Sequence, residues 1–174
     1  MVTGPSERQS GEFIHKAREL VRLLDVKPRG DGQNKSSILL PNGSRIVGLP
    51  SNESKVRCFS AASMLVIDEA ARAADVLYRA MRPMLAVSGG DLWCLSTPNG
   101  KKGFFWDAWS TGGDAWTRIS APATECARIP AAFLEEERRT HPENEFRQEY
   151  MCEFTQDSEG LFDMDLVDAA FEDY

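Results

Sequence analysis

An uninterrupted apolar run ends in two acidic residues at Met64-Leu-Val-Ile-Asp68-Glu69. A strand that is covered on both faces reads as a continuous apolar run, whereas a half-exposed strand alternates. Strands of the covered kind occur in parallel sheets that have helices on both faces. The segment therefore predicts a central strand over residues 64–68, and it favours an α/β chain over an all-α or all-β one.

Helix and strand patterns alternate along the rest of the chain. Apolar residues at helical spacing predict a helix from Ser6 to Leu24, packed by one face. Asn42-Gly43 lies between two β-type runs and predicts a hairpin. Further helices are expected at 75–87, 104–109, 131–140 and 143–150, and further strands at 91–97 and 116–121. The alternation predicts a three-layer α/β domain with a largely parallel sheet.

Charge and composition limit the partners and the compartment. The 174 residues carry a net charge of −7, so the surface as a whole is not built to hold nucleic acid by counterion release. Any DNA contact must be local, and the basic and aromatic cluster at 101–106 is interpreted either as core or as such a contact. No apolar stretch approaches the roughly 18 residues that span a bilayer, which predicts a soluble intracellular protein without a membrane partner.

The cysteines give no metal signal. Cys58, Cys94, Cys126 and Cys152 lie far apart without CxxC spacing, and the chain has two histidines. Zinc sites in proteins are usually marked by such spacing. We therefore expect reduced, mostly buried thiols.

The acids that follow the predicted central strand give the sharpest chemical signal. Asp68 and Glu69 have the form of a Walker B motif, in which the Asp holds Mg²⁺ and the next Glu polarises an attacking water. The alternative is an acidic strand end that leads into a helix N-terminus, where negative charge is favourable. The two residues alone leave both interpretations open.

Hydroxyl side chains end the second apolar run, at Leu95-Ser96-Thr97-Pro98-Asn99-Gly100. A hydroxyl at a strand tip can bond a phosphate oxygen or an attacking water. The alternative is a plain strand-to-loop turn, since Pro-Asn-Gly supplies one by itself.

The order of these segments resembles the ATPase core of the large terminase subunits of tailed phages. The resemblance covers roughly Ser6 to Phe154 and rests on Leu40-Pro-Asn-Gly-Ser-Arg-Ile, Val56-Arg57-Cys-Phe-Ser, Leu65-Val-Ile-Asp-Glu-Ala-Ala-Arg72 and Leu95-Ser-Thr-Pro-Asn-Gly. It implies a P-loop NTPase-like fold of the additional-strand class. It also implies a partial ATPase domain over residues 1–154 and, over 155–174, a linker toward a nuclease domain.

The resemblance also assigns roles. ATP and Mg²⁺ are the implied cofactors: Asp68 would hold the metal, Glu69 would activate the hydrolytic water, and Ser96 and Thr97 would couple hydrolysis to movement. Arg57 would be an arginine finger on a neighbouring subunit of a homo-oligomer. Cys58 stands where the family usually has Gly, and the alternative for Arg57 is a surface ion pair. The implied partners are double-stranded viral DNA, a portal protein and a small terminase subunit, in the host cell cytoplasm.

The sequence departs from that family at the phosphate site. The Walker A motif, GxxxxGK[ST], does not occur in the chain. The most similar segment, Gly30-Asp-Gly-Gln-Asn-Lys-Ser36, is rejected because it leads into a predicted strand, whereas a phosphate-binding loop leads into the N-terminus of a helix. We therefore expect an N-terminally truncated fragment, split gene or degenerate prophage copy, inactive alone. Such a domain would lack a middle strand and expose the strands that flank it.

The acids near the C-terminal end, Asp163, Asp165 and Asp168, fit the first turns of a linker helix better than a nuclease site. Two other classes of function remain as alternatives. One is a remnant of a helicase-like ATPase of the same additional-strand class. The other is a non-enzymatic interaction module that has inherited the acids and hydroxyls without using them.

Overall fold

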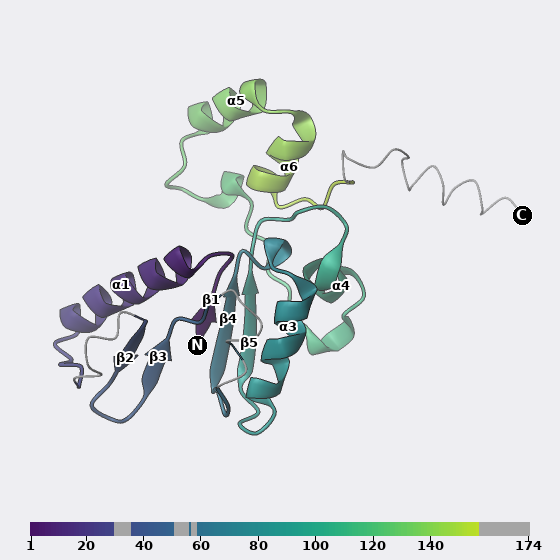
Figure 1. Ribbon diagram of the computed structural model, residues 1–174. Helices are drawn as coiled ribbons and strands as arrows, with labels where there is room; N and C mark the ends of the chain where they lie inside the picture. The colour runs from purple at the N-terminus through teal and green to yellow at the C-terminus, as the bar shows by residue number, and fades with distance from the viewer. Residues whose placement is uncertain (30–35, 51–55, 57–58, 157–174) are drawn as a thin grey trace, which may run out of the picture. The chain divides into compact units, whose positions relative to one another are not determined.

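A computed structural model describes residues 1–29, 36–50, 56 and 59–156 (Figure 1). The chain divides into two compact units, Met1–Ser96 and Thr97–Tyr174. The predicted division at 154/155 concerns a different boundary and stays a prediction.

The first unit is built on a parallel sheet of order β1-β4-β5, which Figure 1 shows with β4 in the middle. The strands are β1 (Val2–Thr3), β4 (Met64–Asp68) and β5 (Asp91–Leu95). β4 pairs over its full length with β5, so that Asp68 lies opposite Leu95, and Thr3 of β1 lies opposite Ile67. The predicted α/β class, central strand and parallel pairing are confirmed. β1 was not predicted, because two residues are too few to show a period.

The two faces of this sheet differ in burial. Leu65 and Ile67 point to one face and are fully buried. On the other face Met64, Trp93 and Leu95 are 44%, 53% and 47% exposed. The expectation of strands covered on both faces is therefore wrong for the β4–β5 pair, because neither helices nor strands of the described residues bury this second face.

Helix α1 (Glu7–Leu23) confirms the helix predicted at 6–24. Ser6 caps it in a capping box: the Ser6 hydroxyl accepts from the Gln9 N–H, and the Gln9 side chain accepts from the Ser6 N–H. Its packed face consists of Ser10, Ile14 and Val21. Other members of the predicted apolar face, among them Phe13, Leu20 and Leu24, are exposed.

A separate antiparallel hairpin, β2 (Ser37–Leu39) with β3 (Arg45–Val47), confirms the predicted one. Leu40 donates its N–H to the Ser44 carbonyl, so the loop consists of the three residues Pro41, Asn42 and Gly43. Gly43 has φ +86°, the left-handed conformation that such a loop needs and that glycine adopts without strain.

The connection from β4 to β5 runs through η1 (Ala70–Arg72), α3 (Asp75–Met81) and η2 (Arg82–Leu85). The single helix predicted at 75–87 is corrected to an α-helix that passes into a 3₁₀ turn at Arg82. Pro83 explains the change, since it lacks the N–H that would continue the i→i−4 ladder. Leu77, Ala80 and Met81 are the buried residues of α3.

The second unit is helical in its described part. It contains α4 (Gly103–Ser110), η3 (Gly113–Ala115), η4 (Ala123–Glu125), α5 (Ala131–Thr140) and α6 (Glu143–Met151). The helices predicted at 104–109, 131–140 and 143–150 are confirmed. Within the described residues no helix is long and apolar enough to cross a membrane.

The strand predicted at 116–121 does not form. Trp116 has extended dihedrals, but residues 116–121 pair with no other strand among the described residues, and Ile119 is 79% exposed. Arg118 holds this segment instead, by donating to the carbonyls of Trp109 at 2.6 Å and Ala108 at 2.9 Å. A β-type sequence remains an extended loop when no neighbouring strand offers it a hydrogen-bond ladder.

Candidate functional site

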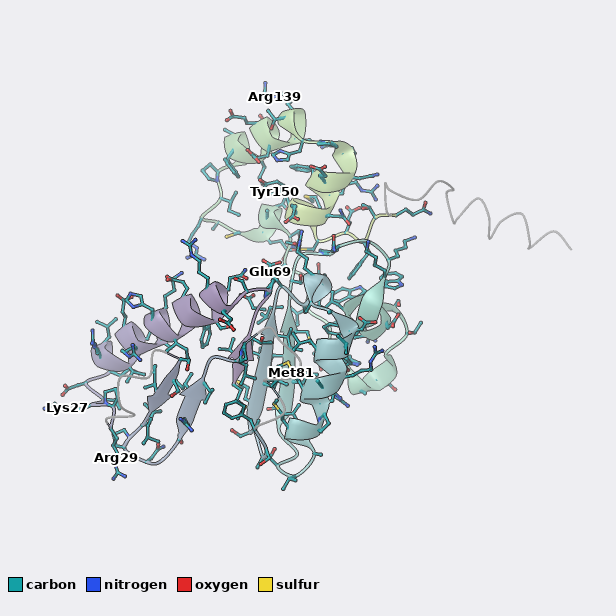
Figure 2. All side chains as sticks on the ribbon, viewed as in Figure 1. Lys27, Arg29, Glu69, Met81, Arg139 and Tyr150 are labelled. Carbon is teal, nitrogen blue, oxygen red and sulfur yellow. The ribbon has the colours of Figure 1, made fainter. Side chains whose placement is uncertain are left out.

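The two acids of the predicted Walker B motif lie at the carboxyl end of β4. Asp68 is the last residue of the strand, and Glu69 directly precedes η1 as its N-cap, in the left-handed conformation with φ +52° and ψ +44°. Figure 2 labels Glu69 at this end of the sheet. A non-glycine residue in that conformation costs on the order of 1 kcal/mol or more, and such residues cluster at functional sites. The sharp turn also places two adjacent carboxylates at one sheet edge.

The two carboxylates have different partners. One Asp68 oxygen accepts from the Glu69 backbone N–H at 3.2 Å. Glu69 Oε2 lies 3.2 Å from Arg72 Nη1, and the side chains of Glu69 and Arg72 are 39% and 36% exposed. A pair this exposed stabilises by at most about 1 kcal/mol, so a ligand can displace it. The second Asp68 oxygen faces no side-chain donor that we observe in the described part of the chain.

Ser96 reaches the same edge. Asp68 pairs with Leu95, so Ser96 is the first residue past the paired end of β5. Its Oγ is buried and has no hydrogen-bond partner within the described residues. Leaving a buried hydroxyl unbonded costs about 1–3 kcal/mol, so it calls for an explanation such as a ligand or water.

β1 brings two more residues to this edge that the sequence did not suggest. Thr3, 1% exposed, has a buried Oγ1 without a partner in the described residues. An added Cβ at Gly4 would meet Asp68 Cβ at 3.9 Å and Gln9 Cβ at 3.3 Å. Gly4 thus lets the β1–α1 turn pass close to Asp68. The sequence pattern that could have located these two residues is Val2-Thr-Gly-Pro-Ser6 followed by an amphipathic helix, because it is typical of a strand, a turn and a capped helix.

Thr97 belongs to the second unit. Its hydroxyl donates to Glu149 Oε2 of α6 at 3.1 Å, and the Gly100 N–H donates to Gln148 Oε1 at 2.8 Å. The loop after β5 is therefore fastened to α6. The structure groups Asp68, Glu69 and Ser96, whereas the coupling role expected of Thr97 stays a prediction.

Two predicted sets of residues fall outside the described residues. They are Arg57 with Cys58, and the acids Asp163, Asp165 and Asp168. Within the described ranges no group of three or more His, Cys, Asp or Glu side chains could hold a metal ion by itself.

The predicted DNA-contact cluster is partly a packed one. Phe154 lies against Phe105, Trp106 and Trp109, with ring centroids 5.9, 4.9 and 5.7 Å apart. Phe104 is buried. These rings form an aromatic core in the second unit, which favours the core interpretation, and Lys101 and Lys102 remain exposed beside them.

The described thiols are half-buried rather than mostly buried, and none is in a disulfide: Cys94, Cys126 and Cys152. Burial raises the pKa of the Cys94 thiol to about 12, against a smaller opposing effect of the Arg82 charge. The Arg128 backbone N–H is the main cause that lowers the pKa of Cys126.

Comparison with known proteins gives one family and one fold. The family described as "Terminase large subunit, T4likevirus-type, N-terminal" matches residues 3–168. No curated protein sequence matches the chain.

Solved structures of phage large terminases share the fold. One is a variant of the ATPase domain of the Thermus phage P74-26 large terminase, with a TM-score of 0.66, 19% identity, and coverage of 88% of this chain and 76% of that chain. Another is the large terminase of a thermophilic bacteriophage in complex with ADP, with a TM-score of 0.73 and 10% identity. The match to this ADP complex covers 88% of our chain but 40% of the terminase chain. At these identities the likeness concerns the fold alone.

Proposed function

The chain belongs to the terminase large-subunit N-terminal family of the T4likevirus type, and from this premise we propose that it is part of an ATP-driven motor that moves viral DNA into procapsids. The observation that carries the proposal is the grouping of Asp68, Glu69 and the unbonded Ser96 hydroxyl at one edge of a parallel sheet. Open α/β sheets bind their ligands at this carboxyl edge.

The environments of the residues support distinct roles. Asp68 would hold the metal, since one of its oxygens has no side-chain donor among the described residues. Glu69, at the turn, orients and activates the attacking water once it leaves Arg72. Ser96 donates its hydroxyl to a phosphate oxygen or to that water, which removes the cost of an unbonded buried group. Thr97, tied to α6 through Glu149, transmits the change at Ser96 to the second unit.

Mg²⁺ fits this donor set. The ion is usually held by one or two carboxylates together with waters and substrate phosphates rather than by an all-protein cage. One Asp68 oxygen without a side-chain donor among the described residues, beside Glu69, meets that need. Bound Mg²⁺ would neutralise charge on the β- and γ-phosphates of ATP.

The remaining assignments concern the whole motor. We propose that Arg57 acts as an arginine finger on a neighbouring subunit of a homo-oligomer. Viral double-stranded DNA, a portal protein and a small terminase subunit are the proposed partners, in the host cell cytoplasm. Residues 155–174 are proposed to lead toward a nuclease domain, by the family pattern.

Catalysis by this chain alone is expected to be absent. The chain contains no GxxxxGK[ST] pattern, so no P-loop amides or Lys hold the β- and γ-phosphates against the metal. Purified chain should hydrolyse ATP no faster than its Glu69→Gln variant, measured by phosphate release. A turnover that disappears in Glu69→Gln would show that the chain supplies its own phosphate site.

Metal binding tests the site directly. Mn²⁺ serves as the probe for Mg²⁺, and electron paramagnetic resonance measures its free concentration in a titration of the full chain. Loss of one charge about 4 Å from a divalent ion weakens its attraction by at least about 1 kcal/mol, so Asp68→Asn should bind at least about fivefold more weakly. Asp91→Asn, at the opposite end of the same sheet, is the matched control and should bind like wild type. Equal Mn²⁺ affinity of wild type and Asp68→Asn would refute the metal site.

A further inference from the structure

The buried hydroxyl of Ser96 needs support from the residues around it. Its Oγ has no hydrogen-bond partner among the described residues, and leaving a buried hydroxyl unbonded is unfavourable. A group in such a state persists only where neighbouring contacts prevent the chain from moving it to water or to another partner. The segment that follows it, Thr97-Pro98-Asn99-Gly100, carries contacts of this kind.

This loop has few free backbone torsions. Pro98 fixes its own φ, and a residue that precedes proline, here Thr97, is restricted to extended conformations. Gly100 is buried and has φ +72°, a conformation that favours glycine. Contacts at the two ends of such a loop therefore fix most of its path.

Both ends of the loop are held by neighbouring residues of α6. The Thr97 hydroxyl donates to Glu149 Oε2 at 3.1 Å, and the Gly100 N–H donates to Gln148 Oε1 at 2.8 Å. The bond to Gln148 is partly buried, whereas the bond to Glu149 is exposed. Water competes less for a shielded bond, so Gln148 is the stronger of the two supports.

α6 is itself fixed on another side. Phe146 is buried, and the Tyr150 hydroxyl donates to Glu137 Oε2 of α5. The rings of Phe146 and Tyr150 lie 5.3 Å apart, as expected of residues four apart on a helix. Gln148 and Glu149 lie between these two in sequence and therefore on other sides of the helix. α6 thus joins a packed anchor to the loop.

We propose that Gln148 and Glu149 are positioning residues of the candidate site. By holding Gly100 and Thr97, they keep the buried Ser96 hydroxyl at the end of β5. The proposal rests on the proposed function, because it names the support of the hydroxyl that this function directs to a phosphate oxygen or to water. Gln148 lies 48 residues after Gly100, so no local sequence pattern marks it.

Nuclear magnetic resonance of the full chain, without nucleotide or metal, tests the proposal. The three-bond couplings between Hα and Hβ of Ser96 report whether one χ1 rotamer dominates, and wild type should show a single rotamer. Gln148→Leu removes the acceptor of the Gly100 N–H at similar side-chain size. The Ser96 couplings should then become averaged over rotamers, and hydrogen exchange of the Gly100 amide should become at least about tenfold faster.

Two substitutions on α6 serve as controls for Gln148→Leu. Gln148→Glu keeps an acceptor oxygen and should preserve the wild-type readings at Ser96 and Gly100. Asn144→Leu is the matched amide-to-leucine change one helical turn earlier, at an exposed position, and should also leave them unchanged. A merely structural Gln148 would lower the free energy of unfolding in urea and leave the Ser96 couplings as in wild type.

Thr97→Val tests the second support, because it removes the hydroxyl that Glu149 accepts at nearly constant shape. It should also average the Ser96 rotamers, whereas Thr97→Ser, which keeps a hydroxyl, should not. Circular dichroism checks that each variant folds. If Gln148→Leu does not fold, Thr97→Val decides the proposal by the same couplings, because it alters an exposed bond.

Three outcomes overturn the proposal. They are averaged Ser96 rotamers in wild type, a single rotamer that persists in either Gln148→Leu or Thr97→Val, and an equal change in Asn144→Leu. The measurement is independent of the proposed function, since neither ATP nor metal is present. The expected Ser96 changes in a chain whose Mn²⁺ affinity is unaffected by Asp68→Asn would refute the metal site and keep the positioning role. The reverse result would refute the positioning role and keep the metal site.

Discussion

The two edges of the sheet in the first unit carry similar apolar residues in opposite environments. At the β1 edge Val2 and Leu49 are buried and joined by a backbone hydrogen bond. At the β5 edge Trp93 and Leu95 are about half exposed, and the N–H groups of Leu92 and Cys94 point away from β4. An apolar sequence alone therefore does not place a strand in the interior of a sheet. The predictions below test this contrast, from the largest expected effect to the smallest.

Thiol reactivity should show that β5 is covered on one face although its other face is exposed. Cys94 lies on the covered face with Leu65 and Ile67. Burial raises its pKa to about 12, so at pH 8 much less of this thiol is ionised than of an ordinary thiol. Iodoacetamide followed by mass spectrometry should therefore label Cys94 at least about tenfold more slowly than an ordinary thiol, and the rate should rise with pH.

Cys126 is the internal reference for this measurement, because its pKa is lowered and it should react first. Equal labelling of Cys94 and Cys126 in the folded chain would show that β5 is exposed on both faces.

Truncation of one leucine at each edge should have unequal costs. Leu49→Ala removes a fully buried side chain at the β1 edge and should lower the free energy of unfolding by about 2–5 kcal/mol. Leu95→Ala removes a half-exposed side chain and should cost about 1 kcal/mol or less. Urea unfolding of both variants measures the difference. Equal losses would mean that the β5 edge is already covered in the free chain.

Close packing of Gly90, just before β5, against the backbone that precedes β4 gives a test of the β4–β5 pairing. A Cβ at Gly90 would collide with the Ala62 carbonyl oxygen and lie 2.7 Å from Ser63 backbone atoms. Gly90→Ala should therefore cost about 1–3 kcal/mol, measured by thermal and urea unfolding.

Gly11→Ala is the matched substitution on α1, where an added Cβ meets no atom within 4 Å. It should raise stability by about 0.5–1 kcal/mol, through helix propensity. A neutral Gly90→Ala would show that β5 does not start against β4 as described.

The smallest effect is expected at Asp68. Its oxygen accepts from the Glu69 N–H, which the amide oxygen of Asn can also do, while the repulsion between adjacent carboxylates is lost. In chelator, Asp68→Asn should change the free energy of unfolding by less than about 0.5 kcal/mol or raise it slightly. A loss of about 1 kcal/mol or more would assign Asp68 a purely structural role.

Local patterns were sufficient for part of this fold. Apolar residues at helical spacing located the start of α1 within one residue, and Asn42-Gly43 located the hairpin. Asp68 and Glu69 were identified as chemical candidates because a strand end followed by two acids lies within six residues. The 3₁₀ turn after Met81 was foreseeable from Pro83.

Three of the errors share one cause. β1 was missed, residues 116–121 were predicted as a strand, and the β4–β5 pair was predicted to be covered on both faces. Each of these depends on a partner far away in the sequence. The two-residue strand β1 forms because it pairs with β4. Residues 116–121 stay an extended loop because no neighbouring strand among the described residues offers them backbone hydrogen bonds.

The sequence by itself determined which segments are helical, which are apolar and extended, and which acids and hydroxyls end the extended ones. Only the tertiary structure decided that Ser96 meets the Asp68 edge, that Thr3 and Gly4 join it, and that one side of β5 is open. The physical reason is that helices satisfy their backbone hydrogen bonds locally, whereas a strand acquires its bonds and its burial from neighbours that the local sequence does not specify.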